Sequence, residues 1–206
     1  MKWRNKKMEM VNINRNCSTD VMKCVEDVTD RAVNAQVEKN LFLGEYKERI
    51  IKALTFEEIK EKGIYYEIEE ALENKDVAKM VISRHADFDD IKKYIEIAKR
   101  KKIPYKMIDN LLCEGQIALV VVAKDAITHE DGDEIVVTSK LETCHIKHLP
   151  DVYYEAMESA ICDFHMNIIN KEMPEYAKNY KNLTFMDKLL GSKCPICQKL
   201  GGKKRC

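Results

Sequence analysis

Three short apolar segments between residues 79 and 123 form the clearest hydrophobic pattern in the chain. Residues 79–83, 105–108 and 117–123 are rich in β-branched side chains, and breaking residues bound each of them. This composition and length are typical of β-strands. Because the third segment is apolar throughout, its strand is predicted to be central in a sheet.

An amphipathic helix is predicted between the first two strands. Its buried face consists of apolar residues at three- and four-residue spacing, namely Phe88, Ile91, Tyr94, Ile95 and Ala98. Asp87 occupies the position of an N-cap, and Pro104 follows the basic last turn. Because strand, helix and strand are joined by short connections, the two strands are predicted to pair in parallel through a right-handed crossover.

Weaker patterns precede this unit. Residues 18–20 can cap a helix whose apolar side would consist of Val21, Val25, Val28, Ala32 and Ala35. A second helix is predicted over residues 44–54, with its inward face formed by Tyr46, Ile50, Ala53 and Leu54. An extended or turn segment at residues 55–59, a break at Gly63 and a third helix over residues 66–73 are expected to follow.

Further elements are predicted after the apolar strand. A last strand is expected over residues 134–138, and the compact domain is expected to close near residue 140. A long helix is then predicted over residues 151–170, with an apolar stripe formed by Tyr153, Met157, Ala160, Ile161, Phe164 and Ile168. A shorter helix near residues 184–190 would end at Gly191.

Composition narrows the class of protein. The 206 residues include 35 basic and 35 acidic side chains, a balance that argues weakly against a dedicated nucleic-acid binder and shows no DNA-specific signal. The longest apolar run has seven residues, far short of the roughly 20 needed to span a bilayer, so no membrane association is expected. The basic N-terminus lacks the apolar stretch of a secretory signal, which predicts a cytoplasmic protein whose eight cysteines are mostly reduced.

Four segments together resemble the YueI-like family of uncharacterised bacterial proteins, namely residues 43–49, 79–83, 94–98 and 117–126. The resemblance extends over about residues 38–137. It implies an α/β fold, a compact sandwich in which helices cover a small mixed sheet, of the chorismate-mutase-like or ribosomal-L30e-like type. The predicted organisation is therefore a helical N-terminal extension (1–40), the YueI-like domain (41–140) and a helical, cysteine-bearing C-terminal extension (141–206).

The resemblance implies no catalytic residues. Its fold neighbours include RNA-binding proteins, which makes RNA binding the leading analogy, although fold alone does not determine function. Those RNA binders typically present glycine, asparagine, glutamate and lysine at a helix start. That cluster is absent after Gly63, after Gly115 and at Asp87.

Cysteine and histidine are enriched in the C-terminal extension. Cys194 and Cys197 have the spacing of a zinc knuckle, and Cys162 and His165 lie three residues apart on the predicted long helix, off its apolar stripe. These four residues could form a Cys3His zinc site that ties the last segment to the helix. Three further residues could replace a member, namely Cys144, His148 and Cys206.

Two other interpretations of these residues stay open. They could be reduced surface cysteines and unliganded histidines in a mobile tail, because a second knuckle is missing. They could also include a redox dithiol, although Cys194 does not lie at the start of a helix that follows a strand. A site with four protein ligands would be structural, since a catalytic zinc keeps one position open.

A second candidate site lies at the carboxyl ends of the first two strands. Ligands of open α/β sheets bind at such ends, and here they carry Arg84, His85, Asp87, Asp109 and Asn110. These groups could hold an anionic ligand or transfer a proton. Alternatively, they are a helix cap, turn formers and an exposed histidine with no ligand.

The sequence therefore predicts a non-enzymatic binding or interaction protein, because no glycine-rich phosphate loop or other catalytic motif is found. RNA is the first expected partner, and the lysine and arginine runs at residues 99–102 and 203–205 could contact its phosphates. The alternative is a small-molecule sensor or enzyme that uses His85 and Asp109. A protein adaptor, marked by an exposed apolar stripe on a terminal helix, is a third interpretation.

Overall fold

The computed structural model describes residues 33–109, 115–129 and 134–200. The chain divides into two units, Met1–Glu38 and Lys39–Cys206. Residues 33–41 are helical, whereas the predicted cap at residues 18–20 and most of its apolar stripe lie outside the described residues. Within the described chain, no helix is both long and apolar enough to cross a bilayer.

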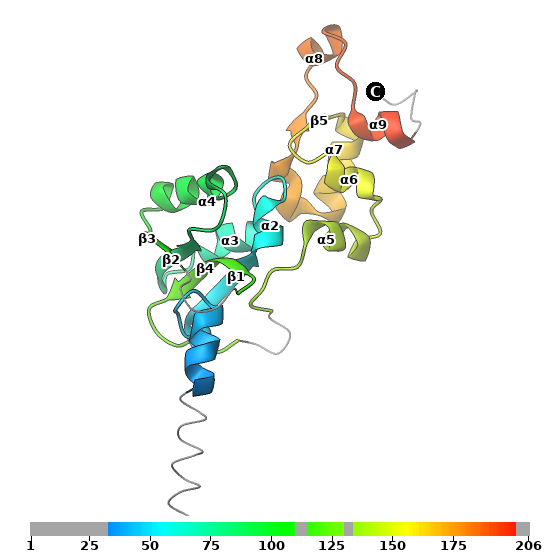
Figure 1. Cartoon of the computed structure of the whole chain (residues 1–206). Coiled ribbons are helices and arrows are strands. Elements are labelled where there is room, and N and C mark those ends of the chain that lie inside the picture. The colour runs from blue at the N-terminus through cyan, green and yellow to red at the C-terminus, as the bar shows by residue number, and fades with distance from the viewer. Residues whose placement is uncertain (1–32, 110–114, 130–133, 201–206) are drawn as a thin grey trace, which may run out of the picture. The chain divides into compact units, whose positions relative to one another are not determined.

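Residues 50–123 of the second unit contribute four strands to one mixed sheet (Figure 1). Its strand order is β1 (Ile50–Thr55), β4 (Ile117–Ala123), β2 (Val77–Ser83) and β3 (Tyr105–Ile108). Strand β4 pairs antiparallel with both β1 and β2, and every residue of β4 is buried. Strands β2 and β3 pair in parallel, as their crossover connection predicted.

The two faces of this sheet pack against different parts of the chain. Because side chains alternate along a strand, Met80 and Ile82 face one side while Val81 faces the other. The first side forms a core with helices α2 (Phe56–Lys60), α3 (Tyr66–Ala71) and α4 (Phe88–Arg100). The partly buried residues that pack against the opposite side from outside the sheet are Phe42, Ile135 and Val136.

Helix α4 follows its prediction closely. Ile91, Tyr94, Ile95 and Ala98 are buried, but Phe88 at the first turn is 61% exposed. Asp87 is the N-cap residue, yet its side chain makes no capping hydrogen bond. Periodicity thus identified the helix and most of its buried face, while its first residue lies beyond the edge of the sheet core.

The prediction for residues 44–59 was wrong. Instead of a helix, residues 47–49 form the short 3-10 helix η1 (Lys47–Arg49) and β1 follows it. A β-bulge between Ile50 and Lys52 interrupts strict alternation. The resulting buried positions at Ile50, Ala53 and Leu54 have a spacing that also fits a helix.

Helix α2 was missed because its signal is a cap. The Thr55 hydroxyl accepts hydrogen bonds from the backbone of Glu57 and Glu58, and the Glu58 carboxylate accepts one from the Thr55 backbone N–H at 2.8 Å. This capping box begins a helix where an extended segment was expected. The prediction of a helix at residues 66–73 is confirmed by α3.

The strand predicted over residues 134–138 is reduced to one isolated parallel bridge between Ala53 and Val136. Ala53 N–H donates to the Ile135 carbonyl at 2.8 Å, and Val137 N–H donates to the Ala53 carbonyl at 3.0 Å. The apolar segment at residues 134–138 was identified correctly, but only Val136 pairs with β1, and no full strand forms.

The C-terminal part has its own apolar core. Its elements are α5 (Lys140–Ile146), α6 (Asp151–Glu155), β5 (Ala160–Ile161), α7 (Asp163–Glu172), η2 (Pro174–Asn179), β6 (Lys181–Asn182), α8 (Phe185–Leu189) and α9 (Pro195–Leu200). We call their buried cluster the C-terminal core; its members include Cys144, Tyr153, Met157, Ile161, Cys162, Ile169, Tyr176, Cys194 and Ile196. The predicted helix near residues 184–190 corresponds to α8.

The prediction of a single long helix over residues 151–170 was wrong. The chain leaves α6 and turns at Glu158, which has a positive φ of 67°, and its N–H donates to the Asn179 carbonyl at 2.6 Å. Strand β5 then pairs in parallel with β6, about twenty residues further along the chain. This long-range pairing overrides the local helical pattern.

Replacing Gly63 with alanine is expected to destabilise the folded protein. Its φ is +74°, and an added Cβ would lie 2.5 Å from Asn179 Cγ. That amide cannot move freely, because it bonds the Ile64 backbone N–H at 3.0 Å and carbonyl at 2.9 Å. We expect Gly63→Ala to lower the free energy of unfolding by about 3 kcal/mol in urea titrations. Gly44→Ala is the matched control.

Gly44 also has a positive φ, of 82°, but an added Cβ there would meet nothing within 4 Å. Its substitution should therefore cost only about 1 kcal/mol, the backbone strain alone. Equal losses in the two variants would contradict a role for the contact between Gly63 and Asn179.

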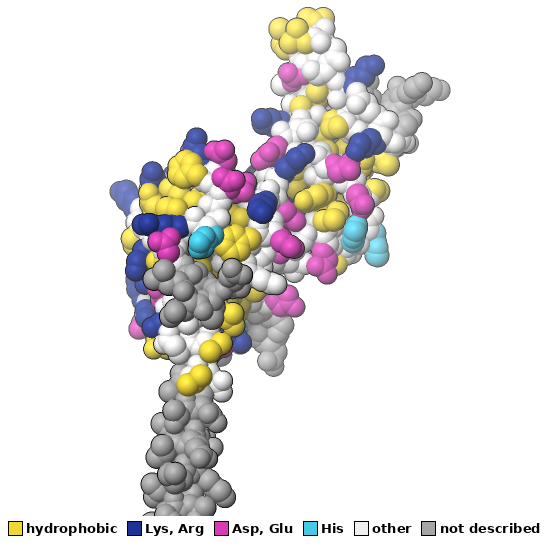
Figure 2. Space-filling model, viewed as in Figure 1, with side chains coloured by type: hydrophobic (Ala, Val, Ile, Leu, Met, Phe, Trp, Pro, Cys, Tyr) yellow, Lys and Arg dark blue, Asp and Glu magenta, His cyan; other side chains and the backbone are white. Residues whose placement is uncertain are grey.

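The surface carries two distinct groupings of side chains. Figure 2 shows Lys and Arg side chains over α4 and β3, and hydrophobic side chains gathered over α8. Within the basic run at residues 99–102, Arg100 pairs with Glu69 at 3.5 Å and Lys101 pairs with Glu73 at 2.5 Å. Part of this run is therefore neutralised by neighbouring carboxylates.

Candidate metal centre

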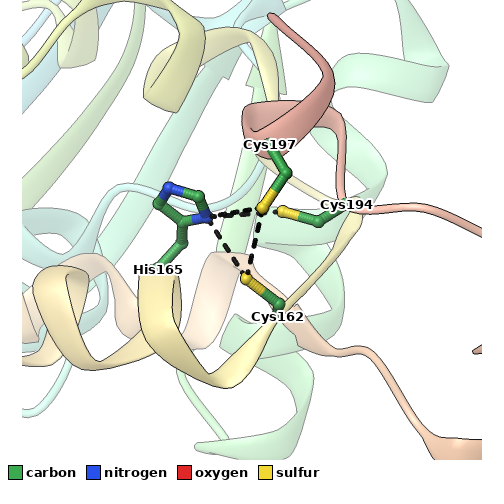
Figure 3. Close-up of side chains that lie close together, drawn as sticks. All are labelled: Cys162, His165, Cys194 and Cys197. Carbon is green, nitrogen blue, oxygen red and sulfur yellow. Dashed lines mark hydrogen bonds between the residues drawn. The ribbon is translucent and has the colours of Figure 1, made fainter. Parts of the chain in front are cut away.

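Four side chains from two distant segments meet within the C-terminal core (Figure 3). Cys162 is the N-cap residue of α7, and His165 lies in the first turn of that helix. Cys194 immediately precedes α9, and Cys197 lies in it. All four side chains are buried, and their ligand atoms lie within 4.8 Å of one another.

Four of the six separations between these atoms are close to those of a tetrahedral zinc site. His165 Nδ1 lies 3.3 Å from Cys162 Sγ, 3.5 Å from Cys194 Sγ and 3.6 Å from Cys197 Sγ. Cys162 Sγ and Cys197 Sγ are 3.7 Å apart. Tetrahedral zinc bonds of about 2.3 Å to sulfur and about 2.0–2.1 Å to nitrogen imply S–S separations of about 3.8 Å and S–N separations of about 3.6 Å.

The local fold explains how these ligands converge. At the start of α7, a residue at the N-cap and one three positions later lie side by side, so Cys162 and His165 face the same point. The Cys194-Pro-Ile-Cys197 turn presents two sulfurs across the first turn of α9, and Ile196 between them is fully buried. Ile196 thus anchors this turn in the C-terminal core, where α9 packs against α6 and β5.

Ionisation of the buried thiols would require a compensating positive charge. Burial raises the pKa of the Cys162 thiol, and the adjacent Cys194 sulfur raises it further. Hydrogen bonds from the backbone N–H groups of His165 and Phe164 act in the opposite direction and stabilise the thiolate. Several thiolates can lie this close together in an apolar core only with a compensating positive charge.

Aromatic rings enclose the imidazole. The His165 ring lies edge to face with Tyr153 at 5.7 Å and with Phe164 at 5.2 Å between centroids.

The cysteines of the cluster differ in oxidation state. Cys162 and Cys194 are free thiols, whereas Cys197 is disulfide-bonded. Because a metal binds thiolates and not disulfides, occupation of this cluster belongs to the reduced protein.

The substitute ligands considered from sequence lie elsewhere. Cys144 belongs to the C-terminal core, where its Sγ lies 3.8 Å from Met173 Sδ and burial raises the pKa of its thiol to about 11. His148 is exposed, and its φ is +55°. Cys206 lies outside the described residues.

The strand-end candidates form a looser group on the surface. Arg84 and Asp109 make an exposed ion pair at 3.5 Å. His85 and Asp87 are exposed, and the backbone N–H of His85 donates to Ser83 Oγ at 3.2 Å. Asn110 lies outside the described residues. A cavity of about 230 Å³ lies instead between α3, α5 and η2, and none of these candidates lines it.

Sequence reasoning missed a buried charged group at the start of α5. Lys140 is completely buried, and its Nζ donates to the carbonyls of Lys62 at 2.7 Å and Gly63 at 3.4 Å. The ammonium group also lies 3.8 Å from the centre of the Tyr65 ring. No signal in the surrounding polar sequence distinguishes this lysine from the exposed ones.

The α/β part of the chain has known relatives. The sequence model of the family described as "Protein of unknown function (DUF1694)" matches residues 18–133, more than half of the chain. The chain belongs to this family. Together with the sequence similarity to YueI given next, this match confirms the predicted YueI-like relationship. The match ends before the first residue of the Cys/His cluster.

Both the sequence and the structure of this chain are similar to those of one relative. The chain is 29% identical over 93 residues to the uncharacterized protein YueI of Bacillus subtilis (strain 168), covering 45% of this chain and 70% of YueI. The crystal structure of YueI from Bacillus subtilis matches with 27% sequence identity and a TM-score of 0.48, covering 51% of this chain and 80% of that one.

Proposed function

We propose that this DUF1694 protein binds one structural zinc ion through Cys162, His165, Cys194 and Cys197. The observation that carries the proposal is the convergence of four buried donor atoms, in which all three sulfurs lie within 3.6 Å of His165 Nδ1. Chance burial of three cysteines and a histidine in one core would not require all three sulfurs to surround the same nitrogen.

The donor set favours zinc among the common metals. Three thiolates and one imidazole suit zinc, whereas magnesium and calcium prefer oxygen ligands. Four protein ligands also leave no open position for water or substrate, which is the arrangement of a structural site.

The proposed ion would join two segments that are distant in the sequence: Cys162 and Cys197 are 35 residues apart. Helix α9 has six residues and is too short to be stable by itself in water. Beyond Ile196 and the two cysteines, its described residues are partly or fully exposed. Metal ligation would therefore supply much of the free energy that holds α9 against α7.

The wider role that we propose is binding rather than catalysis, with the zinc-stabilised part carried beside the DUF1694 domain. RNA binding and an L30e-like or chorismate-mutase-like fold are supported only by resemblance and stay predictions. Salt-dependent retention of the protein on immobilised RNA would test the first of these.

Metal analysis tests the zinc proposal directly. Full-length protein purified under reducing conditions without added zinc is expected to carry about one equivalent per chain. Cys194→Ser should reduce the zinc content strongly, because it removes one of four ligands. Cys144→Ser is the matched control, since Cys144 is a buried free thiol of the same core outside the cluster. Less than about a tenth of an equivalent in the wild type would overturn the proposal.

A further inference from the structure

Helix α8 exposes an unusual amount of apolar surface. Four of the six residues from 185 to 190 are large and apolar, and their exposed fractions are 77% for Phe185, 61% for Met186, 70% for Leu189 and 79% for Leu190. No residue of α8 is buried, and no other described element packs extensively against it. Contiguous exposed apolar side chains of this kind mark interaction sites.

The segment that carries α8 is anchored at both ends. Leu183 is buried and its N–H donates to the Ile161 carbonyl at 2.8 Å, while Cys194 at the other end is fully buried. Thr184 and Asp187 form a capping box, in which Asp187 accepts hydrogen bonds from the Thr184 N–H at 2.8 Å and hydroxyl at 2.6 Å. The apolar side chains are therefore presented from a defined short helix.

Basic residues flank this apolar helix in the sequence. From residue 176 to the C-terminus the sequence contains eight Lys and Arg residues and one acidic residue, Asp187, although the whole chain is electrically balanced. Lys181 lies on β6 just before this segment, Lys188 lies in α8 and Lys193 follows it, and all three are exposed. The one carboxylate is held in the capping box. The segment thus combines apolar side chains with a net positive charge.

The size of the patch argues against a second copy of this chain as the occupant. Four side chains of about 150–200 Å² each, of which 61–79% is exposed, offer about 500 Å². Each partner in a standard interface buries about 800 Å². A bilayer surface needs no shape complementarity. It binds short apolar helices more strongly when lysines accompany them.

We infer that the apolar face of α8, with Lys181, Lys188 and Lys193, is a peripheral contact surface for anionic lipid bilayers. Phe185, Met186, Leu189 and Leu190 would enter the interface while the lysines contact lipid phosphates. This surface contact differs from a membrane span, whose absence from the sequence led us to expect no membrane association. The inference goes beyond the zinc proposal, although Cys194 anchors one end of the segment.

Vesicle co-sedimentation of the full chain tests the inference. Wild-type protein is expected to sediment with phosphatidylcholine vesicles that contain phosphatidylserine, and less with phosphatidylcholine alone. Phe185→Ser with Leu189→Ser should weaken partitioning at least about tenfold. Lys188→Glu with Lys193→Glu should weaken it by at least about fivefold for each lysine. All four positions are exposed, so the fold should survive.

A matched control replaces exposed apolar residues elsewhere. Phe88→Ser with Ile146→Ser removes side chains of 61% and 63% exposure outside α8 and should leave partitioning unchanged. No vesicle retention by the wild type, equal effects of both apolar pairs, or a self-associated protein that only the α8 pair dissociates would overturn the inference. Zinc is measured on the same samples: zinc without retention refutes this inference alone, and retention without zinc refutes the metal proposal alone.

Discussion

Removing the proposed zinc ion from the reduced protein is expected to unfold much of the C-terminal part while the four-stranded sheet stays folded. Cys162, Cys194 and Cys197 all belong to the C-terminal core, and none of them contributes to either core of the sheet. Structural zinc supplies about 10–16 kcal/mol of apparent binding free energy in small zinc modules. Even a fraction of that value is large against the usual stability of a domain.

Hydrogen exchange with and without a chelator measures this effect. Amides of α7, η2 and α9 should lose protection in the chelated protein, whereas amides of β4 and β2 should keep it. Intermediate losses are expected in α3, because the Tyr176 hydroxyl donates to both Glu67 carboxylate oxygens at 2.9 Å.

Two variants make this result specific to the metal. Cys162→Ser without chelator should reproduce the pattern, because the cluster would lose a ligand at the start of α7. Cys144→Ser should keep wild-type protection until the chelator is added. Equal loss in the sheet and the C-terminal part, or no loss anywhere, would contradict a local structural role of zinc.

The most regular part of the fold was predictable from sequence. Strands β2, β3 and β4 and helix α4 were identified because each has a local signal: short apolar runs with β-branched residues between breaking residues in the strands, and a 3.6-residue period in the helix. Strand β1 was not identified, because its bulge changes the spacing of buried residues. A local pattern cannot reveal an irregularity that depends on pairing with a strand about seventy residues away.

The candidate ligands were predicted by a partly incorrect argument. Spacing identified both pairs, but Cys162 and His165 were placed on the polar side of a long helix that does not exist. The helical conformation is interrupted at Glu158, which has a positive φ. Cys162 therefore caps a new helix, and its side chain is buried. The pairing of Cys162 with His165 was still predicted correctly, because their three-residue separation places them together in the first turn of any helix that begins there.

The second large expected effect concerns pH. Replacing Lys140 with methionine should remove a rise in stability that the wild type shows between pH 7 and pH 9. Burial lowers the pKa of the Lys140 ammonium group from its usual value of about 10.4 to about 7, and nearby Lys93 lowers it further. Glu61, Glu67 and Glu158 oppose this shift but do not overcome it.

The sign of the effect follows from proton binding. Below about pH 7 the lysine is protonated in both the folded and unfolded states, so the folded state bears the full cost of a buried charge. Above about pH 7 the folded protein releases this proton while the unfolded chain retains it up to about pH 10.4. Stability contributed by Lys140 therefore increases with pH in this window, by up to about 1.4 kcal/mol per pH unit.

Denaturant unfolding of the wild type and Lys140→Met at the two pH values tests this prediction. The difference in unfolding free energy between the two proteins should change by about 2 kcal/mol in favour of the wild type from pH 7 to pH 9. Lys106→Met is the matched control, because Lys106 lies exposed on β3, and its difference from the wild type should stay constant. Using the difference cancels other titrating groups common to both proteins, such as the Cys144 thiol. A pH-independent difference for Lys140→Met would show that Lys140 stays charged in the folded protein, with its hydrogen bonds to Lys62 and Gly63 and the Tyr65 ring compensating for burial.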